Sequence, residues 1–269
     1  NPTRLVVIAG SIGCKGRCDF CVSHRICSVP LHRSPKNIVD EMVWLKQVYG
    51  PGLIFFFSNP LFNADREWVM ALCAEMEKRG PFPSIIMPDF CIDKKMVKAW
   101  KRAGVFLTLM GLEFVNDKMR VKRGKRAGDP ANAYNLCAEK GIITRAFYML
   151  GRLGMTQTDL DEEIKSLLSL PYHPDELRIN FEVPFPGTRR AEQITADDII
   201  LEQRHWTTEQ PVYRTGLTAE KWQKTRRQII HNFHFNPRQQ QHYERQITKF
   251  PELENSYKNF LKEVDSMYD

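Results

Sequence analysis

The segment LVVIAGSIGCKGRCDFC (5–21) places three cysteines directly after an apolar run that predicts a buried β-strand. Cys14, Cys18 and Cys21 have the spacing C-x3-C-x2-C. Thiolates in this number on one loop suit an iron–sulfur cluster or zinc. A closed zinc site takes four ligands, and so does a cluster that only transfers electrons. Three thiolates therefore leave one metal position open to a substrate or cofactor.

Outward from this segment, short apolar runs alternate with stretches of helical periodicity. Ser34 and Pro35 form a helix-start signal, and Gly104 and Gly141 follow two predicted helices as stop signals. The predicted strands are 5–9, 53–58, 84–87, 105–112, 142–150 and 177–183, and the predicted helices are 35–49, 64–79, 93–103, 130–140 and 158–170.

This alternation predicts an α/β fold, because six βα-type units in series imply a parallel sheet with right-handed crossovers. We expect the sheet to curl into a partial (β/α)6 TIM-like barrel over residues 1–189. The chemistry of such folds lies at the carboxyl ends of the strands, where the three cysteines stand. Residues 190–269 are polar and rich in Gln and Arg, with helical stretches near 218–235 and 252–266, and predict a C-terminal helical extension.

Composition fits a globular protein of a reducing compartment. The 269 residues are 42% hydrophobic and 26% charged, and no apolar run approaches the length of a membrane span. Seven cysteines, an odd number gathered towards one end, indicate thiol ligands rather than disulfides, so we expect a cytoplasmic protein. The net charge of +7 is concentrated at 118–126 and 214–249, which are either solvated faces or contacts for phosphate, carboxylate or nucleic acid.

The cysteine spacing, the aromatic Phe20 before the last cysteine and the position after the first strand together resemble the radical S-adenosylmethionine (radical SAM) superfamily. The resemblance implies a [4Fe–4S] cluster on Cys14, Cys18 and Cys21, whose fourth iron binds S-adenosylmethionine. It also implies reductive cleavage of that cofactor, which starts radical chemistry on a C–H bond. The implied partners are a small-molecule or biosynthetic-intermediate substrate and an electron donor such as flavodoxin or ferredoxin.

Residues at other strand ends carry the resemblance further. The segment MGLEF (110–114) is similar to the family's "iGiE" segment, so Glu113 is expected to accept hydrogen bonds from the cofactor's ribose or amino group. Phe20 is expected to pack beside the cluster and offer its backbone near the adenine. Many members have an acidic pair after the second strand; here Ser58 and Asn59 stand there, and Asn59 could accept a hydrogen bond through its carbonyl.

Two later segments complete the expected cofactor site. YMLGRLGMTQTD (148–159) resembles the glycine-containing segment beside the adenine, with Gly151 allowing close backbone approach. Arg145, in the same strand, is either a contact for the cofactor carboxylate or a surface residue. Pro186, in FEVPFPGT (181–188), fixes a turn at the mouth of the expected site, although an exit loop needs proline for backbone reasons alone.

The last segment and HRSPKNIVDEM (32–42) resemble the subgroup whose members often use cobalamin. Cobalamin is therefore an expected further cofactor, with methyl transfer to an unreactive atom as the implied reaction. Most such relatives carry an N-terminal cobalamin domain, which would lie upstream of Asn1 and be missing from this chain. The alternative is a member that works without it.

Two other functions remain open from the residues alone. The basic segments would suit radical modification of RNA, and a zinc-bound interaction module without catalysis would recruit Cys27 or His24 as a fourth ligand. Cys73 and Cys137 lie in helical patterns and are expected to be small buried hydrophobes, whereas Cys91, nearer the rim of the expected site, is interpreted as structural. His231 and His234 are spaced like a zinc pair, but aromatic packing is the preferred interpretation.

Overall fold

The computed structural model describes residues 4–115, 123–124, 128–171 and 174–267. The chain divides into two compact units. Unit 1 comprises residues 1–17, 23–110 and 126–145, and unit 2 comprises residues 18–22, 111–125 and 146–269. None of the helices in the described part of the chain has the length and apolar character needed to cross a bilayer.

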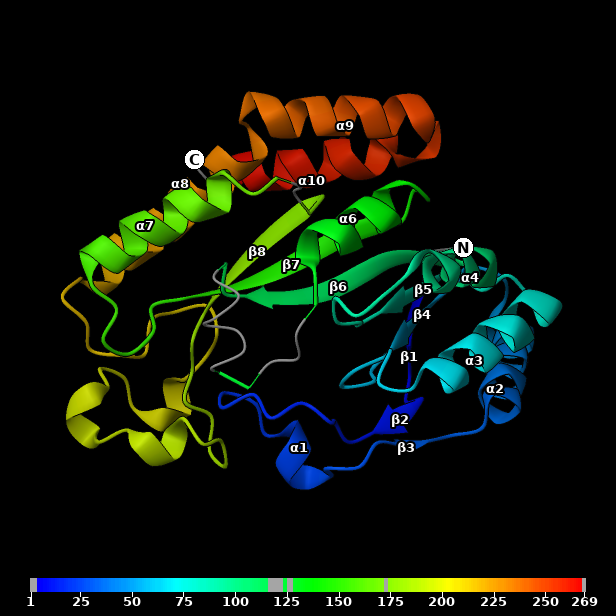
Figure 1. Cartoon of the computed structure of the whole chain (residues 1–269), viewed down its shortest axis with the longest axis horizontal. Helices are drawn as coiled ribbons and strands as arrows, with labels where there is room; N and C mark the ends of the chain where they lie inside the picture. The colour runs from blue at the N-terminus through cyan, green and yellow to red at the C-terminus, as the bar shows by residue number, and fades with distance from the viewer. Residues whose placement is uncertain (1–3, 116–122, 125–127, 172–173, 268–269) are drawn as a thin grey trace. The chain divides into compact units, whose positions relative to one another are not determined.

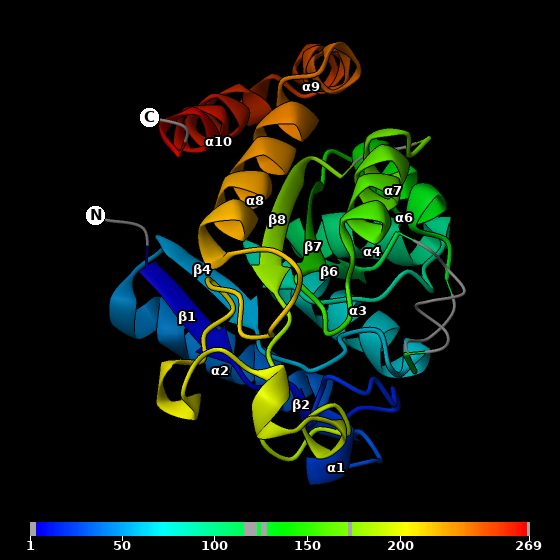
Figure 2. The ribbon, with the colours of Figure 1, turned by 90° about the vertical axis from the view of Figure 1, so that its left-hand side faces the viewer.

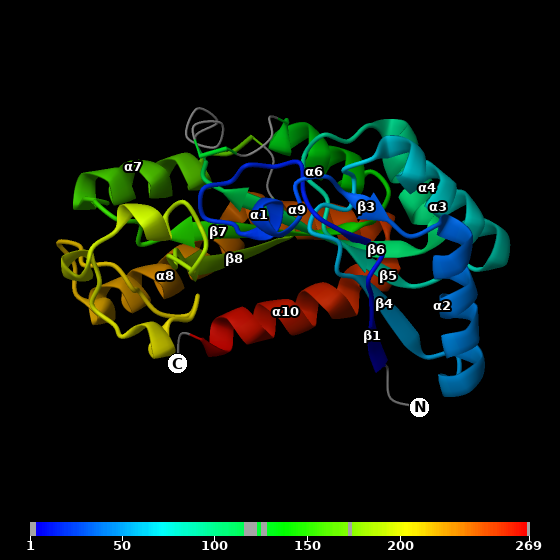
Figure 3. The same cartoon turned by 90° about the horizontal axis from the view of Figure 1, so that it is seen from below.

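Unit 1 alternates strands and helices along most of its length. Helices α2, α3 and α4 lie side by side along it (Figure 3). Its elements are β1 (Arg4–Ile8), β2 (Ser11–Ile12), α1 (Ser23–Ile26), β3 (Leu31–His32), α2 (Pro35–Tyr49), β4 (Leu53–Phe57), α3 (Arg66–Arg79), β5 (Ser84–Ile86), α4 (Lys94–Ala103), the first part of β6 (Val105–Glu113), α6 (Pro130–Ala138) and the start of β7 (Ile143–Leu150).

The strands form one six-stranded sheet in the order β1-β4-β5-β6-β7-β8, where β8 is Glu176–Phe181 (Figure 1). The pairs β1/β4, β4/β5 and β5/β6 are parallel. All six predicted strands are present, so the predicted α/β class with a parallel sheet is confirmed. In this order β1 and β8 stand at the two ends. The end strand β1 is largely exposed at Leu5 and Val7, so the prediction of a buried first strand is wrong.

The helix boundaries follow local capping chemistry. The Ser34 side chain accepts from the Asn37 N–H at 3.3 Å, and Pro35 occupies the first turn of α2, as predicted. Gly104 ends α4 with φ 102°, and a Cβ there would lie 2.3 Å from the Phe82 carbonyl oxygen. Only glycine fits that position, so the stop signal after 93–103 has a steric cause.

A small antiparallel pairing beside the cysteine segment was not predicted. Strands β2 and β3 pair through Ser11 with His32 and through Ile12 with Leu31. Each strand has only two residues, too few to give a periodic signal in the sequence. The pairing returns the chain beside β1, where the Arg33 N–H donates to the Gly10 carbonyl at 3.0 Å.

Unit 2 carries the remaining strand ends and the C-terminal helices. Figure 2 shows α8 running beside β8, and the two elements are in contact. Besides the ends of β6 and β7 and the whole of β8, the elements are α7 (Gln157–Leu168), η1 (Ala191–Gln193), η2 (Ala196–Asp198), η3 (Gln203–His205), α8 (Ala219–His234), α9 (Pro237–Lys249), η4 (Pro251–Leu253) and α10 (Glu254–Ser266).

A buried polar network attaches the C-terminal helices to the start of β8. The Leu177 N–H donates to His234 Nε2 at 3.2 Å, so the ring proton lies on Nδ1, which is 2.7 Å from the Tyr243 hydroxyl. Tyr243 in turn donates to the Asp175 carbonyl at 2.7 Å. The Asp175 carboxylate accepts from Tyr257 at 2.7 Å and lies 2.8 Å from His242 Nε2. One residue, Asp175, thus connects α9 and α10 to the sheet.

Candidate functional site

Cys14 belongs to unit 1 and follows the short β2 strand. It is partly exposed, and its Sγ accepts a hydrogen bond from the Gly16 N–H at 3.3 Å. Its own N–H donates to the Cys27 carbonyl at 3.0 Å. Hydrogen bonds from backbone amides to cysteine sulfur stabilise the thiolate that a metal requires. The setting of Cys14 therefore suits a ligand.

Cys18 and Cys21 belong to unit 2 and are also partly exposed. The Cys21 N–H donates to the Cys18 carbonyl at 3.2 Å, and Cys18 Sγ lies 3.8 Å from the Gly124 carbonyl oxygen. Among the described residues, no three His, Cys, Asp or Glu side chains are grouped so that they could hold a metal ion. The assignment of all three cysteines to one cluster therefore stays a prediction based on their spacing.

Two of the other cysteines are buried, and a third has its thiol engaged in a hydrogen bond. Cys27, the proposed fourth ligand of a zinc module, donates its thiol hydrogen to the Val29 carbonyl at 3.0 Å. Burial raises the pKa of Cys73 to about 12, which keeps it a thiol. Cys137 is buried as well. Cys91 is partly exposed, and its backbone bonds to Asp89 and Asn63 in the loop after β5.

Asn59 follows β4 and is fully buried. Its Oδ1 accepts from the Gly10 N–H at 3.2 Å, which ties the end of β4 to the end of β1. Its Nδ2 is buried and has no hydrogen-bond partner among the described residues. The sequence predicted that Asn59 could accept a hydrogen bond from a ligand. In this arrangement Oδ1 is already used, and the side-chain atom without a partner is the donor Nδ2. This donor would suit a ligand carboxylate better than an ammonium group.

Glu113 ends β6 in a strained turn. Its φ is 60°, and it is the one residue other than glycine with positive φ among the described residues. The Phe114 N–H donates to the Leu112 carbonyl at 2.6 Å, which closes a γ-turn of the rare, strained form. Strained residues of this kind cluster at functional sites, which makes the half-buried Glu113 a candidate site residue. Its expected role as a contact for the cofactor stays a prediction.

Phe20 packs against the residue that follows Glu113. The rings of Phe20 and Phe114 meet edge to face with centroids 6.2 Å apart. The guanidinium of Arg123 lies 5.8 Å from the Phe20 centroid and 5.1 Å from the Phe114 centroid. Within unit 2 the structure therefore brings the part of the loop between Cys18 and Cys21 beside the Glu113 turn.

Arg123 is a residue that the sequence did not single out. It lies in the basic run 118–126. The structure describes only Arg123 and Gly124 of this run, and the prediction for the rest of the run falls outside the described residues. The Arg123 side chain is only 9% exposed and forms ion pairs with Asp19, at 2.5 Å, and with Glu182. In the second basic segment, Arg226 pairs with Glu209 at 2.5 Å, so part of that charge also serves the fold.

The remaining predicted site residues lie at or near strand ends. Gly151, directly after β7, has φ 67°, and a Cβ there would lie 2.9 Å from the Phe181 ring. Pro186 is exposed in the turn after β8, beside Gly187 with φ 82°. Arg145 is partly exposed within β7 and belongs to unit 1. Their expected contacts with the cofactor stay predictions.

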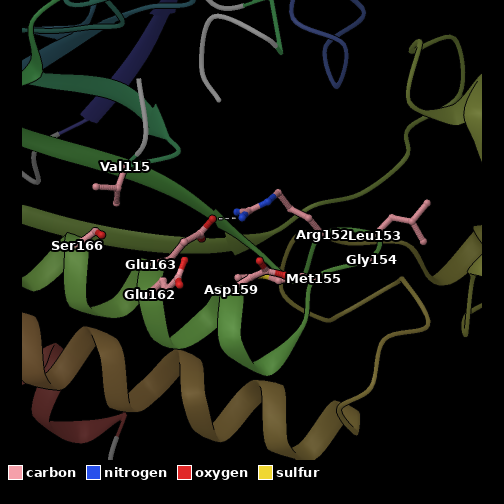
Figure 4. Close-up of a pocket in the computed structure, with 9 residues that line it drawn as sticks. All are labelled: Val115, Arg152, Leu153, Gly154, Met155, Asp159, Glu162, Glu163 and Ser166. Atoms are coloured by element: carbon pink, nitrogen blue, oxygen red, sulfur yellow. Dashed lines mark hydrogen bonds and ion pairs between the residues drawn. The ribbon is translucent and has the colours of Figure 1, made fainter. Parts of the chain in front are cut away.

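A pocket of about 520 Å³ opens in unit 2 where β6 and β7 end (Figure 4). Arg152 and three following residues form one wall, and α7 supplies Asp159, Glu162, Glu163 and Ser166. The Arg152 guanidinium pairs with Glu163, which also accepts from the buried Tyr148 hydroxyl. The Glu163 and Tyr148 side chains raise the pKa of Arg152 although burial alone would lower it.

Replacing Glu163 with alanine should destabilise unit 2 by about 2 kcal/mol, because Arg152 and Tyr148 would both lose their partner in a mostly buried setting. Chemical denaturation followed by circular dichroism would measure the change. Glu162→Ala is the matched control, since Glu162 is an exposed neighbour on the same helix and should change the free energy of unfolding by less than about 0.5 kcal/mol. Equal denaturation midpoints for the two variants would contradict the conclusion that Glu163 is the shared partner of Arg152 and Tyr148.

Comparison with known proteins agrees with this arrangement. Residues 8–167 match the family model of the radical SAM superfamily. The chain is 27% identical over 188 residues to the anaerobic magnesium-protoporphyrin IX monomethyl ester cyclase of Synechocystis sp., a match that covers 68% of this chain and 37% of that protein.

Two solved structures share the fold. The radical S-adenosylmethionine methyltransferase TsrM from Kitasatospora setae, with cobalamin and a [4Fe-4S] cluster bound, aligns with a TM-score of 0.63 at 20% identity over 71% of this chain and 36% of that chain. The radical SAM enzyme coproporphyrinogen III oxidase (HemN) from Escherichia coli aligns with a TM-score of 0.52 at 16% identity over 74% of this chain and 49% of that chain.

At these identities the structural likeness shows the fold alone, and this chain spans little more than a third of the cyclase and of TsrM. The family match is different in kind, because residues 8–167 are more than half of the 269 residues. They include the cysteine segment, the Glu113 turn and the strands from β4 to β7. The chain therefore belongs to the radical SAM superfamily, a family of enzymes.

Proposed function

We propose that this chain is the core of a radical SAM enzyme in which Cys14, Cys18 and Cys21 hold a [4Fe–4S] cluster and S-adenosylmethionine occupies the strand ends beside it. The observation that carries the proposal is the C-x3-C-x2-C loop that follows β1 and the short β2, within a segment that matches the family. The donor set fits the group, because all three residues are partly exposed thiols while Cys73 and Cys137 are buried. Such a cluster supplies one electron and one open iron position.

The residues of the chain then have distinct tasks. Glu113, held by its strained turn, accepts hydrogen bonds from the cofactor, and the buried Asn59 Nδ2 donates one. Phe20 and Phe114 pack together beside the cysteine loop and exclude water from it. The substrate class that we propose is a small molecule or biosynthetic intermediate with an unactivated C–H bond, and the electron comes from a flavodoxin- or ferredoxin-type donor.

Anaerobic reconstitution with iron and sulfide tests the proposal directly. We expect a brown protein with about four irons that converts S-adenosylmethionine to 5′-deoxyadenosine and methionine when dithionite is added. A colourless protein that retains zinc, or one that holds iron without cleaving the cofactor, would overturn it. The reaction can be followed by liquid chromatography without knowledge of the substrate.

Replacing Glu113 with glutamine should weaken binding of S-adenosylmethionine about tenfold or more, because a hydrogen bond to a charged group contributes about 1.5–3 kcal/mol. Iron content should stay at the wild-type level, since Glu113 is not a ligand. Isothermal titration of the reconstituted protein measures the affinity. Glu67→Gln, an exposed glutamate in the first turn of α3, is the control. Unchanged affinity in Glu113→Gln would remove Glu113 from the site.

We further propose cobalamin-dependent methyl transfer as the reaction class. The support is the likeness of the segments 32–42 and 181–188 to the cobalamin-using subgroup, together with the fold shared with TsrM. Incubation with hydroxocobalamin, gel filtration and cobalt analysis test this part separately. One equivalent of retained cobalt would support it. Cleavage of S-adenosylmethionine without any retained cobalt would reject cobalamin-dependent methyl transfer by this chain alone and leave the radical SAM assignment intact.

A further inference from the structure

Arg123 connects three segments of unit 2 that the proposed function uses for different purposes. They are the cysteine loop around Asp19 and Phe20, the strained turn at Glu113 and Phe114, and the end of β8 at Glu182. Asp19 lies between the two cluster ligands Cys18 and Cys21, so a contact with Asp19 acts on the part of the loop that separates them. Arg123 therefore contacts all three segments, and it would affect the proposed cluster site by fixing the positions of these neighbours.

Backbone and side chain of Arg123 both hold the cysteine loop. The Asp19 N–H donates to the Arg123 carbonyl at 3.1 Å, and Arg123 Nε lies 2.5 Å from Asp19 Oδ2. The next residue, Gly124, has its carbonyl oxygen 3.8 Å from Cys18 Sγ. Two bonds of different kinds to one loop residue fix its position more tightly than either alone.

The same guanidinium lies against the Glu113 turn. It is 5.1 Å from the centroid of Phe114 and 5.8 Å from that of Phe20, within the range of cation–π attraction. Arg152 lies 5.1 Å from Phe114 as well. The aromatic pair and its two cations thus connect the cysteine loop with the turn.

Around Arg123, two guanidinium groups and two carboxylates balance in charge. The Glu182 carboxylate is fully buried and accepts from Arg123 and, at 3.2 Å, from Arg190 Nε. The Arg190 backbone N–H also donates to the Asp19 backbone carbonyl at 2.9 Å, so Arg190, like Arg123, contacts both Glu182 and the loop. Burial alone would lower the pKa of Arg123, but Glu182 and Asp19 outweigh that effect and raise it.

We propose that Arg123 is a positioning residue of the radical SAM site, which fixes the cysteine loop against the Glu113 turn and neutralises the carboxylates of Asp19 and Glu182. This inference rests on the proposed function, because it concerns the cluster that Cys18 and Cys21 would help to hold. Without Arg123, the buried Glu182 carboxylate and the partly exposed Asp19 carboxylate would lose their shared cation. The environment of the cluster would become more negative, and the reduced state would be disfavoured.

The test uses the reconstituted full chain and three variants. Arg123→Gln should retain wild-type iron, lose activity in S-adenosylmethionine cleavage about 10- to 100-fold, and shift the cluster midpoint potential to a more negative value. Arg123→Lys keeps the charge and should leave the potential near that of the wild type. The double variant Arg123→Gln/Glu182→Gln restores the charge balance and should recover most of the potential, although not the packing. Potentials come from redox titration followed by electron paramagnetic resonance.

A wild-type potential in Arg123→Gln would overturn the proposal, and so would a shift of equal size in all three variants, because a purely structural defect predicts the latter. If Arg123→Gln does not fold, Glu182→Gln takes its place: it removes one negative charge and should shift the potential to a more positive value, and an unchanged potential there would overturn the proposal. Arg102→Gln, which removes an exposed cation paired with Glu77, is the matched control and should leave the potential unchanged. Failure of the proposed function would show earlier, as absence of iron or of cleavage in the wild type.

Discussion

Replacing Cys14, Cys18 or Cys21 with alanine should reduce cleavage of S-adenosylmethionine to background in each case. A cube held by three thiolates has no spare protein ligand, so the loss of any one opens a second iron and the cluster is not retained. The measurements are iron and sulfide content after anaerobic reconstitution and the yield of 5′-deoxyadenosine with dithionite. Full cleavage by any of the three variants would contradict the ligand assignment.

Two further cysteine variants serve as controls for this prediction. Cys73→Ala should keep the cluster, because Cys73 is buried in α3 and its raised pKa keeps it protonated. Cys27→Ala should also keep it, since the Cys27 thiol is engaged with the Val29 carbonyl. Loss of metal in Cys27→Ala would instead support a four-ligand zinc site on the same loop.

Replacing Asp175 with alanine should destabilise the protein by about 3 kcal/mol or more. The Asp175 side chain is 2% exposed, and its Oδ1 accepts from Tyr257 and lies within hydrogen-bond distance of His242. Burial raises the pKa of Tyr257, so its hydroxyl stays protonated and would be left as an unsatisfied buried donor. Urea denaturation followed by circular dichroism gives the free energy of unfolding.

Asp175→Asn is the matched variant, because an amide oxygen still accepts the Tyr257 hydrogen bond, and it should lose less stability than the alanine variant. Lys258→Ala, on the exposed surface of α10, should change the free energy of unfolding by less than about 0.5 kcal/mol. If Asp175→Ala unfolds at the wild-type urea concentration, the network is not what attaches α9 and α10.

Local signals in the sequence predicted the ends of several helices. Ser34 and Pro35 gave the start of α2, and Gly104 gave the end of α4, because capping and steric effects act within a few residues. Helix α9 was missed although Asn236 and Pro237 form the same kind of start signal. Its buried face includes Gln239 and Gln246, so the apolar periodicity that normally reveals a helix is absent.

The site was predictable only where residue type and position after a strand are informative. The cysteine spacing pointed to the loop, and the segment after 105–112 pointed to Glu113. The buried ion pairs of Arg123 were not predicted, because this residue lies within a basic run that resembled a solvated face. Its burial depends on Asp19 and Glu182, which lie far away in the sequence, and no local pattern encodes such a long-range ion pair.

At position 113, folding and the proposed chemistry favour different residues. Folding alone favours glycine or asparagine there, since a side chain with a Cβ atom is strained at φ 60°. Neutral drift would therefore tend to erase the glutamate in any lineage that no longer used its carboxylate. Among descendants of this protein, the residue at this position would report whether the chemistry is still maintained, independently of whether the fold survives.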